Sequence, residues 1–386
     1  RVISLVGMDI PEATQRATLE ALGFTLNGND VTPPTWRPDI LGDADLVEEV
    51  ARIASLTRLQ GAPMARVLPG VPRPILTPLQ VRERTARRTI AALGYNECVT
   101  YSFIDARAAA LFGGGADAVR VENPISSEMT HLRPDLLPGL LAAAARNQTR
   151  GFMDLAFFEI GPAFHGGEPG DQHLQAAGLL VGAAAARDPH GSRRMVDVFD
   201  AKADAEAVLA ALGAPARTQI TRKVAGWWHP GRSGVIGLGP NTLATFGEVH
   251  PRVLQAMDVK GPAVAFTILV ANVPAPKVKA PTRPALAISD LQAVERDFAF
   301  VVDARVEALT AVNAALGAEK ALIESVRVFD QFTGEKAEAQ MGAGKKSIAL
   351  TVRLQPTAAT LTEAEIEAVS AKIIEKVTKA TGGTLR

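Results

Sequence analysis

The sequence has one cysteine, few aromatic residues and no net charge. The single Cys98 excludes an intrachain disulfide and any metal site built from several cysteines. Lys and Arg total 41, as do Asp and Glu, so no overall field attracts the chain to nucleic acid, and RNA contact needs a local patch. No apolar run approaches the roughly 20 residues that cross a bilayer. These absences favour a soluble protein of a reducing cytoplasm with no membrane partner.

The chain is long enough for several domains. Its 386 residues, 47% of them hydrophobic, predict roughly two to four domains with sizeable cores. Proline-rich stretches at residues 61–78 and 273–284 are typical of linkers. We therefore predict three domains, at residues 1–72, 73–284 and 288–386. The sequence begins without methionine at a strand-like RVISLV, and we interpret the chain as a fragment.

Local signals predict two helices and a hairpin in the first domain. Pro11 opens an amphipathic helix, and Gly23 supplies its C-terminal stop. The dipeptide Asn27-Gly28 is typical of a hairpin turn. A second helix begins near Asp43.

The remaining segments predict two different α+β architectures. The middle domain alternates helices with short apolar runs such as AGLLVG, SGVIGLG and AVAFTILV. Short joins between these runs predict a large, mainly antiparallel sheet with flanking helices. The third domain runs strand, helix, strand, strand, helix and a terminal TLR, the order of the ferredoxin-like split βαβ fold. The predicted fold class is multidomain α+β.

Four acidic residues near the second helix form the constellation with the clearest chemistry. Asp45, Glu48 and Glu49 stand at i, i+3 and i+4 and share one helical face, and Asp39 lies on the preceding loop. Carboxylates gathered at one spot repel each other unless a cation lies among them, and oxygen-only ligands select Mg²⁺ before Ca²⁺. Acidic residues also stabilise the first turns of a helix without any metal, and spacing alone favours that alternative.

The stretch WRPDILGDADLVEEVARI resembles the B5 domain of bacterial-type phenylalanyl-tRNA synthetase β subunits, in which W-R-x-D is followed by D-L-x-E-E. The resemblance implies a structural Mg²⁺ site, shared with the α subunit, whose ligands are Asp39, Asp45, Glu48 and Glu49. Without the α subunit, we expect weak Mg²⁺ binding, with the carboxylates held apart by solvent, Arg37 or Arg52.

The middle domain is similar to the catalytic-like class II synthetase module of the same family, through NPISSEMTHLRPDLLPG, FFEIGPAF and WHPGRSGVIGLG. Class II adenylation needs arginines on the ATP phosphates. Arg133 is the only plausible remnant, because FFEIGPAFHGG lacks an arginine and Arg252 lacks a glycine-rich context. We expect a retained fold with no catalytic residue, and an α-subunit interface that includes NPISSEMTHLRPDLLPG.

Residues 294–386 resemble the ferredoxin-fold anticodon-binding domain that ends this β subunit. Sheet faces of such folds can stack bases on aromatic rings while basic side chains contact phosphates. The candidate tRNA-binding residues are Arg296, Arg327, Phe329, Phe332, Lys336, Lys345, Lys346 and Arg353. The charges of this segment nearly balance, so the residues alone favour a solvated face.

The three resemblances cover nearly the whole chain, and they follow each other in the order in which the domains occur in this family. It implies part of the β subunit of phenylalanine–tRNA ligase, an α2β2 heterotetramer. There the chain would support ATP-dependent charging of tRNA(Phe) by docking the catalytic α subunit and binding tRNA. By itself we expect it to be inactive. The alternative is a stand-alone RNA-binding or assembly scaffold of the same fold.

Overall fold

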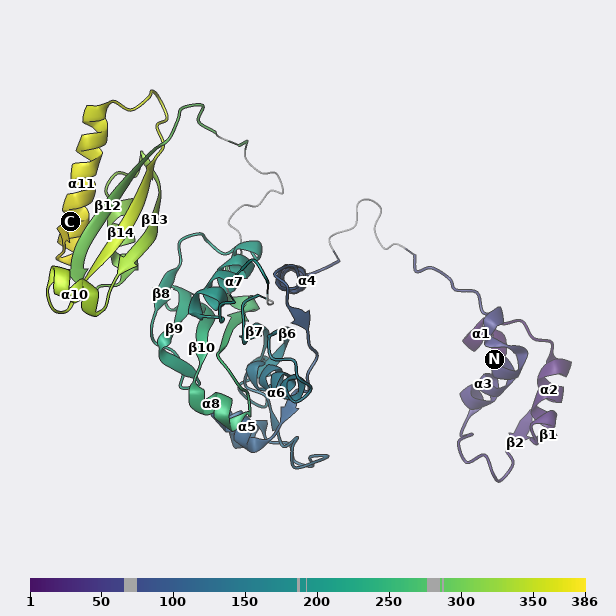
Figure 1. The fold of residues 1–386 in the computed structure, drawn as a ribbon. Coiled ribbons are helices and arrows are strands. Elements are labelled where there is room, and N and C mark those ends of the chain that lie inside the picture. The colour runs from purple at the N-terminus through teal and green to yellow at the C-terminus, as the bar shows by residue number, and fades with distance from the viewer. Residues whose placement is uncertain (66–74, 186–187, 192, 276–284, 287) are drawn as a thin grey trace. The chain divides into compact units, whose positions relative to one another are not determined.

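In a computed structural model of the chain, residues 1–65, 75–185, 188–191, 193–275, 285–286 and 288–386 are described (Figure 1). The chain divides into two compact units, Arg1–Ala275 and Pro276–Arg386. Parts of both expected linkers, residues 66–74 and 276–284, lie outside the described residues. The expected domain boundaries after residues 72 and 284 lie there too. The buried hydrophobic side chains between Val2 and Ala51 form a cluster of their own. The division into three domains stays a prediction.

The N-terminal segment contains short helices and a hairpin around this cluster. Its elements are α1 (Val2–Val6), α2 (Glu12–Ala21), β1 (Thr25–Asn27), β2 (Asp30–Thr32), α3 (Asp43–Ala54) and the 3-10 turn η1 (Leu56–Arg58). The hairpin turns at Gly28, whose φ of 63° suits glycine. The expectation of a strand at RVISLV is wrong. Val2 is buried in the same cluster as Val47 of α3, and Gly7 ends the helix with a left-handed φ of 78°.

A seven-stranded sheet forms the frame of the middle segment. Its order is β3-β6-β7-β11-β10-β9-β8, in which β3 and β6 are parallel and the other neighbours antiparallel. The strands are β3 (Asn96–Glu97), β6 (Leu155–Phe164), β7 (Gln172–Val181), β8 (Gln219–Thr221), β9 (Trp228–Leu238), β10 (Asn241–Val249) and β11 (Ala263–Leu269). A separate pair joins β4 (Phe103–Ile104) to β5 (His131–Leu132). The predicted mainly antiparallel sheet is confirmed.

Helices cover both faces of this sheet. They are α4 (Pro78–Ala92), α5 (Ala106–Leu111), α6 (Leu137–Gln148), α7 (Val198–Ala211) and α8 (Pro251–Ala256), with 3-10 turns η2 (Asp117–Val119), η3 (Pro169–Asp171) and η4 (Val270–Asn272). Successive residues of a strand point to opposite faces. Phe266 of β11 accordingly joins a core with α4 and α7, whereas Ala265 joins a core with α6 and α8. No helix within the described ranges has the length and apolar content needed to cross a membrane.

The C-terminal unit has the predicted ferredoxin-like order. Its elements are β12 (Val294–Asp303), α9 (Ala308–Leu316), β13 (Ile323–Phe332), α10 (Glu335–Met341), β14 (Lys345–Leu354), α11 (Glu363–Thr381) and β15 (Thr384–Leu385). The sheet order is β13-β14-β12-β15, with every pair antiparallel. Buried residues of α9 and α11 share one core with Phe300 and Leu350 of the sheet. The short α10 was not predicted.

A buried ion pair ties the loop before β4 to the large sheet. Arg133 Nη1 donates to Glu159 Oε1 on β6 at 2.8 Å and to Thr100 Oγ1 at 2.9 Å, while Nε donates to the Pro162 carbonyl at 2.9 Å. Thr100 Oγ1 in turn donates to Glu159 Oε2 at 2.6 Å. The two charged side chains are only 2% and 4% exposed. A Cβ at Gly161 would lie 2.7 Å from Arg133 Nη2, so glycine makes room for the guanidinium.

Removing one member of this pair should be costly. In Arg133→Met, the buried carboxylate of Glu159 loses its partner, and we expect the free energy of unfolding to fall by about 3–5 kcal/mol in urea denaturation. Arg133→Met combined with Glu159→Leu removes both charges and should recover most of that loss. Arg87→Met, in an exposed ion pair, is the control and should cost about 1 kcal/mol or less. Equal losses in the single and double variants would contradict this interpretation.

Candidate functional site

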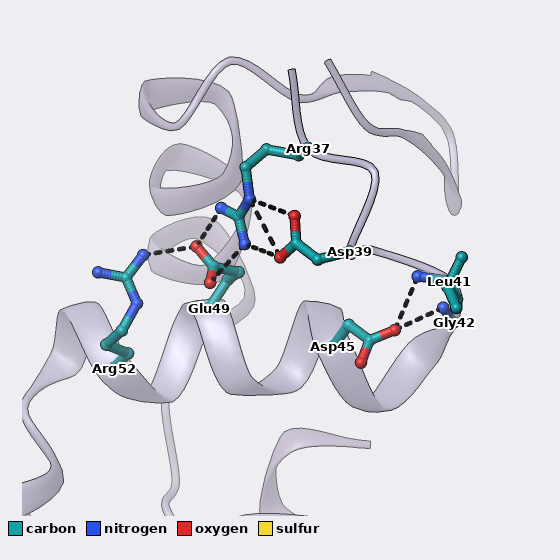
Figure 2. A network of polar contacts seen from close by, with 7 residues as sticks. All are labelled: Arg37, Asp39, Leu41, Gly42, Asp45, Glu49 and Arg52. Carbon is teal, nitrogen blue, oxygen red and sulfur yellow. Dashed lines mark hydrogen bonds and ion pairs between the residues drawn. The ribbon is translucent and has the colours of Figure 1, made fainter. Parts of the chain in front are cut away.

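The four acidic residues predicted as Mg²⁺ ligands differ in their surroundings, and Figure 2 shows three of them, Asp39, Asp45 and Glu49. Glu49 faces the preceding loop and is buried, with its side chain 7% exposed. Asp39 lies on that loop and its side chain is 59% exposed. Asp45 lies at the start of α3, and Glu48 is exposed to solvent. The predicted cluster is therefore divided between the loop and the helix, and its members have different surroundings.

Arg37 lies between two of these carboxylates. Its guanidinium donates to Asp39 through Nε and Nη2, at 3.0 and 2.7 Å, and to Glu49 through Nη1 and Nη2, both at 3.0 Å. Figure 2 shows the planar group bridging the loop and the helix. Arg52, one helical turn beyond Glu49, donates to Glu49 Oε2 at 2.5 Å. Two guanidinium groups thus supply the positive charge at this place.

This bridge changes the acidity of its members. Hydrogen bonds from Arg37 and then Arg52 lower the pKa of Glu49 to about 2, and burial opposes them only in part. The hydrogen bonds of Arg37 also lower the pKa of Asp39. The same contacts raise the pKa of Arg37, so its guanidinium stays charged throughout. Both carboxylates are ionised at neutral pH and are already paired.

Asp45 accepts hydrogen bonds from the backbone instead of pairing with an arginine. Its Oδ2 accepts hydrogen bonds from the N–H groups of Leu41 and Gly42, both at 2.8 Å, at the N-terminal end of α3. A carboxylate there also interacts favourably with the helix dipole. This is the role that the metal-free alternative predicts for an acidic residue in the first turn.

Within the described ranges, no three His, Cys, Asp or Glu side chains are grouped so that they could hold a metal ion. Arg37 occupies the space between Asp39 and Glu49, and Asp45 bonds to the backbone. As arranged here, the donor set does not fit Mg²⁺, which needs several oxygen ligands around one point. Arg37 pairs with Asp39 and Glu49, and Arg52 pairs with Glu49. The assignment of the four as Mg²⁺ ligands stays a prediction.

The middle segment combines a buried arginine with an exposed apolar surface. Arg133 is bound inside the protein by Glu159 and Thr100, so its guanidinium does not face an open cleft. The loop that contains Thr100 exposes two large side chains, with Val99 91% and Tyr101 72% exposed. A cavity of about 550 Å³ lies beside them. Ile125, within NPISSEMTHLRPDLLPG, is 96% exposed.

Strand register divides the candidate tRNA-binding residues between the two faces of the C-terminal sheet. Residues directly opposite each other in antiparallel strands share a face. Arg327 is directly opposite Thr351, and Arg353 lies two residues after Thr351 on β14. Both therefore lie on the face of the sheet away from α9 and α11. Lys345, opposite Asp303, shares that face.

The other candidates do not all share that face. Arg296 and Lys346 are opposite Val352 and Val302, two residues of the helix-covered core, and Lys346 is buried. Phe329 is exposed at an irregularity of β13. Phe332 is opposite Ser347 and therefore shares the open face with Lys345, whereas Lys336 lies on α10. The eight residues therefore do not form one patch.

Acidic side chains accompany the basic ones on the open face. Arg353 donates to Glu324 at 2.6 Å and lies 3.5 Å from Glu295, so two carboxylates neutralise it. The near balance of acidic and basic residues in this segment of the sequence is thus also found around Arg353 on the open face of the sheet.

Sequence reasoning missed the exposed side chains before β4. Val99 and Tyr101 belong to NECVTYSFI, which forms the short strands β3 and β4 with a loop between them. Thr100, between them, points to the buried Glu159. The alternation of apolar and polar residues was the available signal, but it does not say which face is buried.

Three family models match the chain in succession. They describe a tRNA synthetase B5 domain over residues 1–55, a phenylalanyl tRNA synthetase beta chain CLM domain over residues 66–270 and a ferredoxin-fold anticodon binding domain over residues 289–386.

Curated proteins that are similar to the chain over its whole length are β subunits of the same family. A phenylalanine–tRNA ligase beta subunit of Cereibacter sphaeroides is 80% identical over 386 residues, which are 100% of this chain and 48% of that protein. The corresponding protein of Ruegeria pomeroyi is 69% identical over 387 residues, with the same coverage. The chain spans about half the length of the curated relatives it matches. A solved pyrrolysyl-tRNA synthetase from Desulfitobacterium hafniense matches 50% of this chain and 67% of that one, at 17% identity and a TM-score of 0.39, too low to support an argument.

The bridge around Glu49 predicts a pH dependence. The pKa of Glu49 is about 2 in the folded chain and 4.5 ordinarily, so its stabilising effect is complete above about pH 5 and is lost as the pH falls toward 2. Hydrogen exchange of the α3 amides, corrected for intrinsic rates, should show this loss in the wild type. In Glu49→Gln, protection should be lower at pH 7 and should depend less on pH across that window, although Asp39 and Asp45 still titrate near α3. The exposed Glu12→Gln is the control. Parallel pH profiles for wild type and Glu49→Gln would show that the bridge does not stabilise α3.

Proposed function

The chain belongs to the phenylalanyl-tRNA synthetase β-chain family, and from that membership we propose that it is a non-catalytic part of a cytoplasmic phenylalanine–tRNA ligase. The observation that carries the proposal is the succession of three family models, together with 80% identity to a β subunit across the whole chain. In an α2β2 enzyme the chain would dock the catalytic α subunit and hold tRNA(Phe) during ATP-dependent charging.

The state of Arg133 supports a non-catalytic role. An arginine that binds ATP phosphates must present its guanidinium to the substrate. Here that group bonds to Glu159, Thr100 and the Pro162 carbonyl. By itself the chain would catalyse no phenylalanine-dependent exchange of pyrophosphate into ATP.

The exposed surface of the middle segment supports docking of the α subunit. Large apolar side chains gathered on a soluble protein are typical of an interface. Val99, Tyr101 and the partly exposed Phe103 line one cavity together with Met257. Ile125 is a further exposed apolar residue of the same segment. The anchored Thr100 holds this loop in place, so the surface is preorganised.

The C-terminal unit would contact the tRNA. The matching family model describes an anticodon-binding domain. Arg327 and Lys345 on the open face would meet phosphates, and the exposed Phe329 could stack on a base. Arg353 would first have to leave Glu324, so we rank it below these three.

Magnesium would bind the N-terminal segment only in competition with Arg37. An ion between Asp39 and Glu49 must displace the guanidinium from both. Ligands supplied by the α subunit would offset this cost. The chain by itself would then bind Mg²⁺ weakly.

A test of docking changes the exposed loop alone. Val99→Asp with Tyr101→Asp places two charges in the proposed interface, and we expect the Kd for the α subunit, measured by calorimetry, to rise at least about tenfold, or 1.4 kcal/mol. Phe199→Asp, which alters a 70% exposed residue of α7, is the control and should leave the Kd unchanged. Unchanged binding by the double variant, or no protection from hydrogen exchange at residues 90–141 when the α subunit is added, would contradict this surface.

A test of the metal titrates Mg²⁺ against subunit association. If Mg²⁺ is shared with the α subunit, each must tighten binding of the other by the same factor. Glu48→Gln with Glu49→Gln keeps the side-chain shapes and removes two charges, so association should lose its Mg²⁺ dependence. Glu12→Gln serves as the control. Equal Mg²⁺ curves for the wild type and the double variant would exclude the shared site.

A further inference from the structure

A second cavity lies on the face of the large sheet that α6 and α8 cover. Its volume is about 280 Å³, which suits a small molecule no larger than about an amino acid. The lining residues that matter here are Phe112, Asp135, Gln175, Trp227, Trp228 and Thr267. Neither the docking surface nor the tRNA-binding candidates include any of them.

A buried carboxylate belongs to this lining. Asp135 is 5% exposed, accepts from the Leu137 N–H at 2.9 Å and lies at 3.5 Å from Gln175 Nε2. The Leu136 N–H is a further donor, and because an ionised carboxylate offers about four acceptor positions, some capacity stays unused. Burial raises its pKa to about 6, against the lowering effect of these bonds. A cation beside Asp135 would relieve the cost of that burial.

Aromatic rings form the other part of the lining. Phe112 and Trp227 contact each other with ring centroids 5.9 Å apart and planes tilted by 47°. Trp228 is 2% exposed. Tryptophan faces attract cations more strongly than other aromatic rings do, and they also accept apolar groups. A buried carboxylate among aromatic rings thus selects a positively charged group attached to an apolar body.

Two basic residues also line the cavity, and both are exposed. They are His165, which stacks on His173 with centroids 4.2 Å apart, and Lys223. Their exposure leaves them screened by water, whereas Asp135 is desolvated. The interaction with a ligand charge is therefore stronger at Asp135 than at either basic residue.

We propose that this cavity is a binding site for a small primary ammonium compound with an apolar tail, the ammonium bonded to Asp135 and the tail against Trp227 and Trp228. Threonine hydroxyls at Thr245 and Thr267, directly opposite each other on β10 and β11, complete the polar side of the site. The site goes beyond the docking role and does not depend on it.

Phenethylamine is a suitable probe. Two of the three tryptophans in the sequence line the cavity, so its binding should change the intrinsic fluorescence saturably. Asp135→Asn keeps an acceptor for the Leu137 N–H and removes the charge, and we expect it to raise the Kd at least about tenfold. Asp204→Asn is the matched control: Asp204 is a half-buried carboxylate that accepts from Tyr95 at 2.5 Å and does not line the cavity. This variant should bind as the wild type does.

Uncharged and anionic analogues separate the possible outcomes. The neutral 2-phenylethanol and the anionic 3-phenylpropionate should bind at least about tenfold more weakly than phenethylamine. Thr245→Leu, which fills the cavity and leaves Asp135 intact, should abolish binding and provides the test if Asp135→Asn does not fold. Absence of saturable binding, equal binding by Asp135→Asn, or a preference for the anion would overturn the proposal.

Discussion

The buried Arg133–Glu159 pair is the interaction on which the middle of the molecule depends. Two charges withdrawn from water are stabilising only when every hydrogen-bonding group around them is matched. Thr100 and the Pro162 carbonyl supply that match. Satisfying the pair fixes the loop that exposes Val99 and the segment that leads to Asp135. The sequence suggested Arg133 as a remnant of phosphate binding, but it acts as a structural support. Its position determines where the exposed loop with Val99 and the segment with Asp135 lie.

Arg37 has a comparable role in the N-terminal segment. A guanidinium is planar and always charged, and it can bond two carboxylates at once. By bridging Asp39 and Glu49 it joins the loop to α3 without a metal. Both places show the same physical rule: a carboxylate that is buried, or that lies close to another, requires a cation, and a protein can provide one from its own sequence. Any external ligand of these carboxylates has to compete with that internal one.

Much of the fold could be predicted because its signals are local. The hairpin at Gly28 and the helix before Gly23 follow from backbone preferences of one or two residues. The ferredoxin-like order follows from the succession of periodic segments. RVISLV was misread because a short, mostly apolar segment fits a strand or a buried helical turn equally well. The burial of Val2 beside α3 resolved that choice, and α3 lies about 40 residues further along the chain.

The sequence by itself determined the family, the types of most elements and which residues carry charge near α3. The partner of each charge was decided by tertiary structure. Spacing places Asp45, Glu48 and Glu49 on one side of a helix, but it does not show that an arginine on the preceding loop will reach Glu49. In the same way, alternation along β14 marks two faces, and only the strand register assigns Lys346 to the covered face and Lys345 to the open one. Contacts between distant segments have no local signal, because they depend on how whole elements pack.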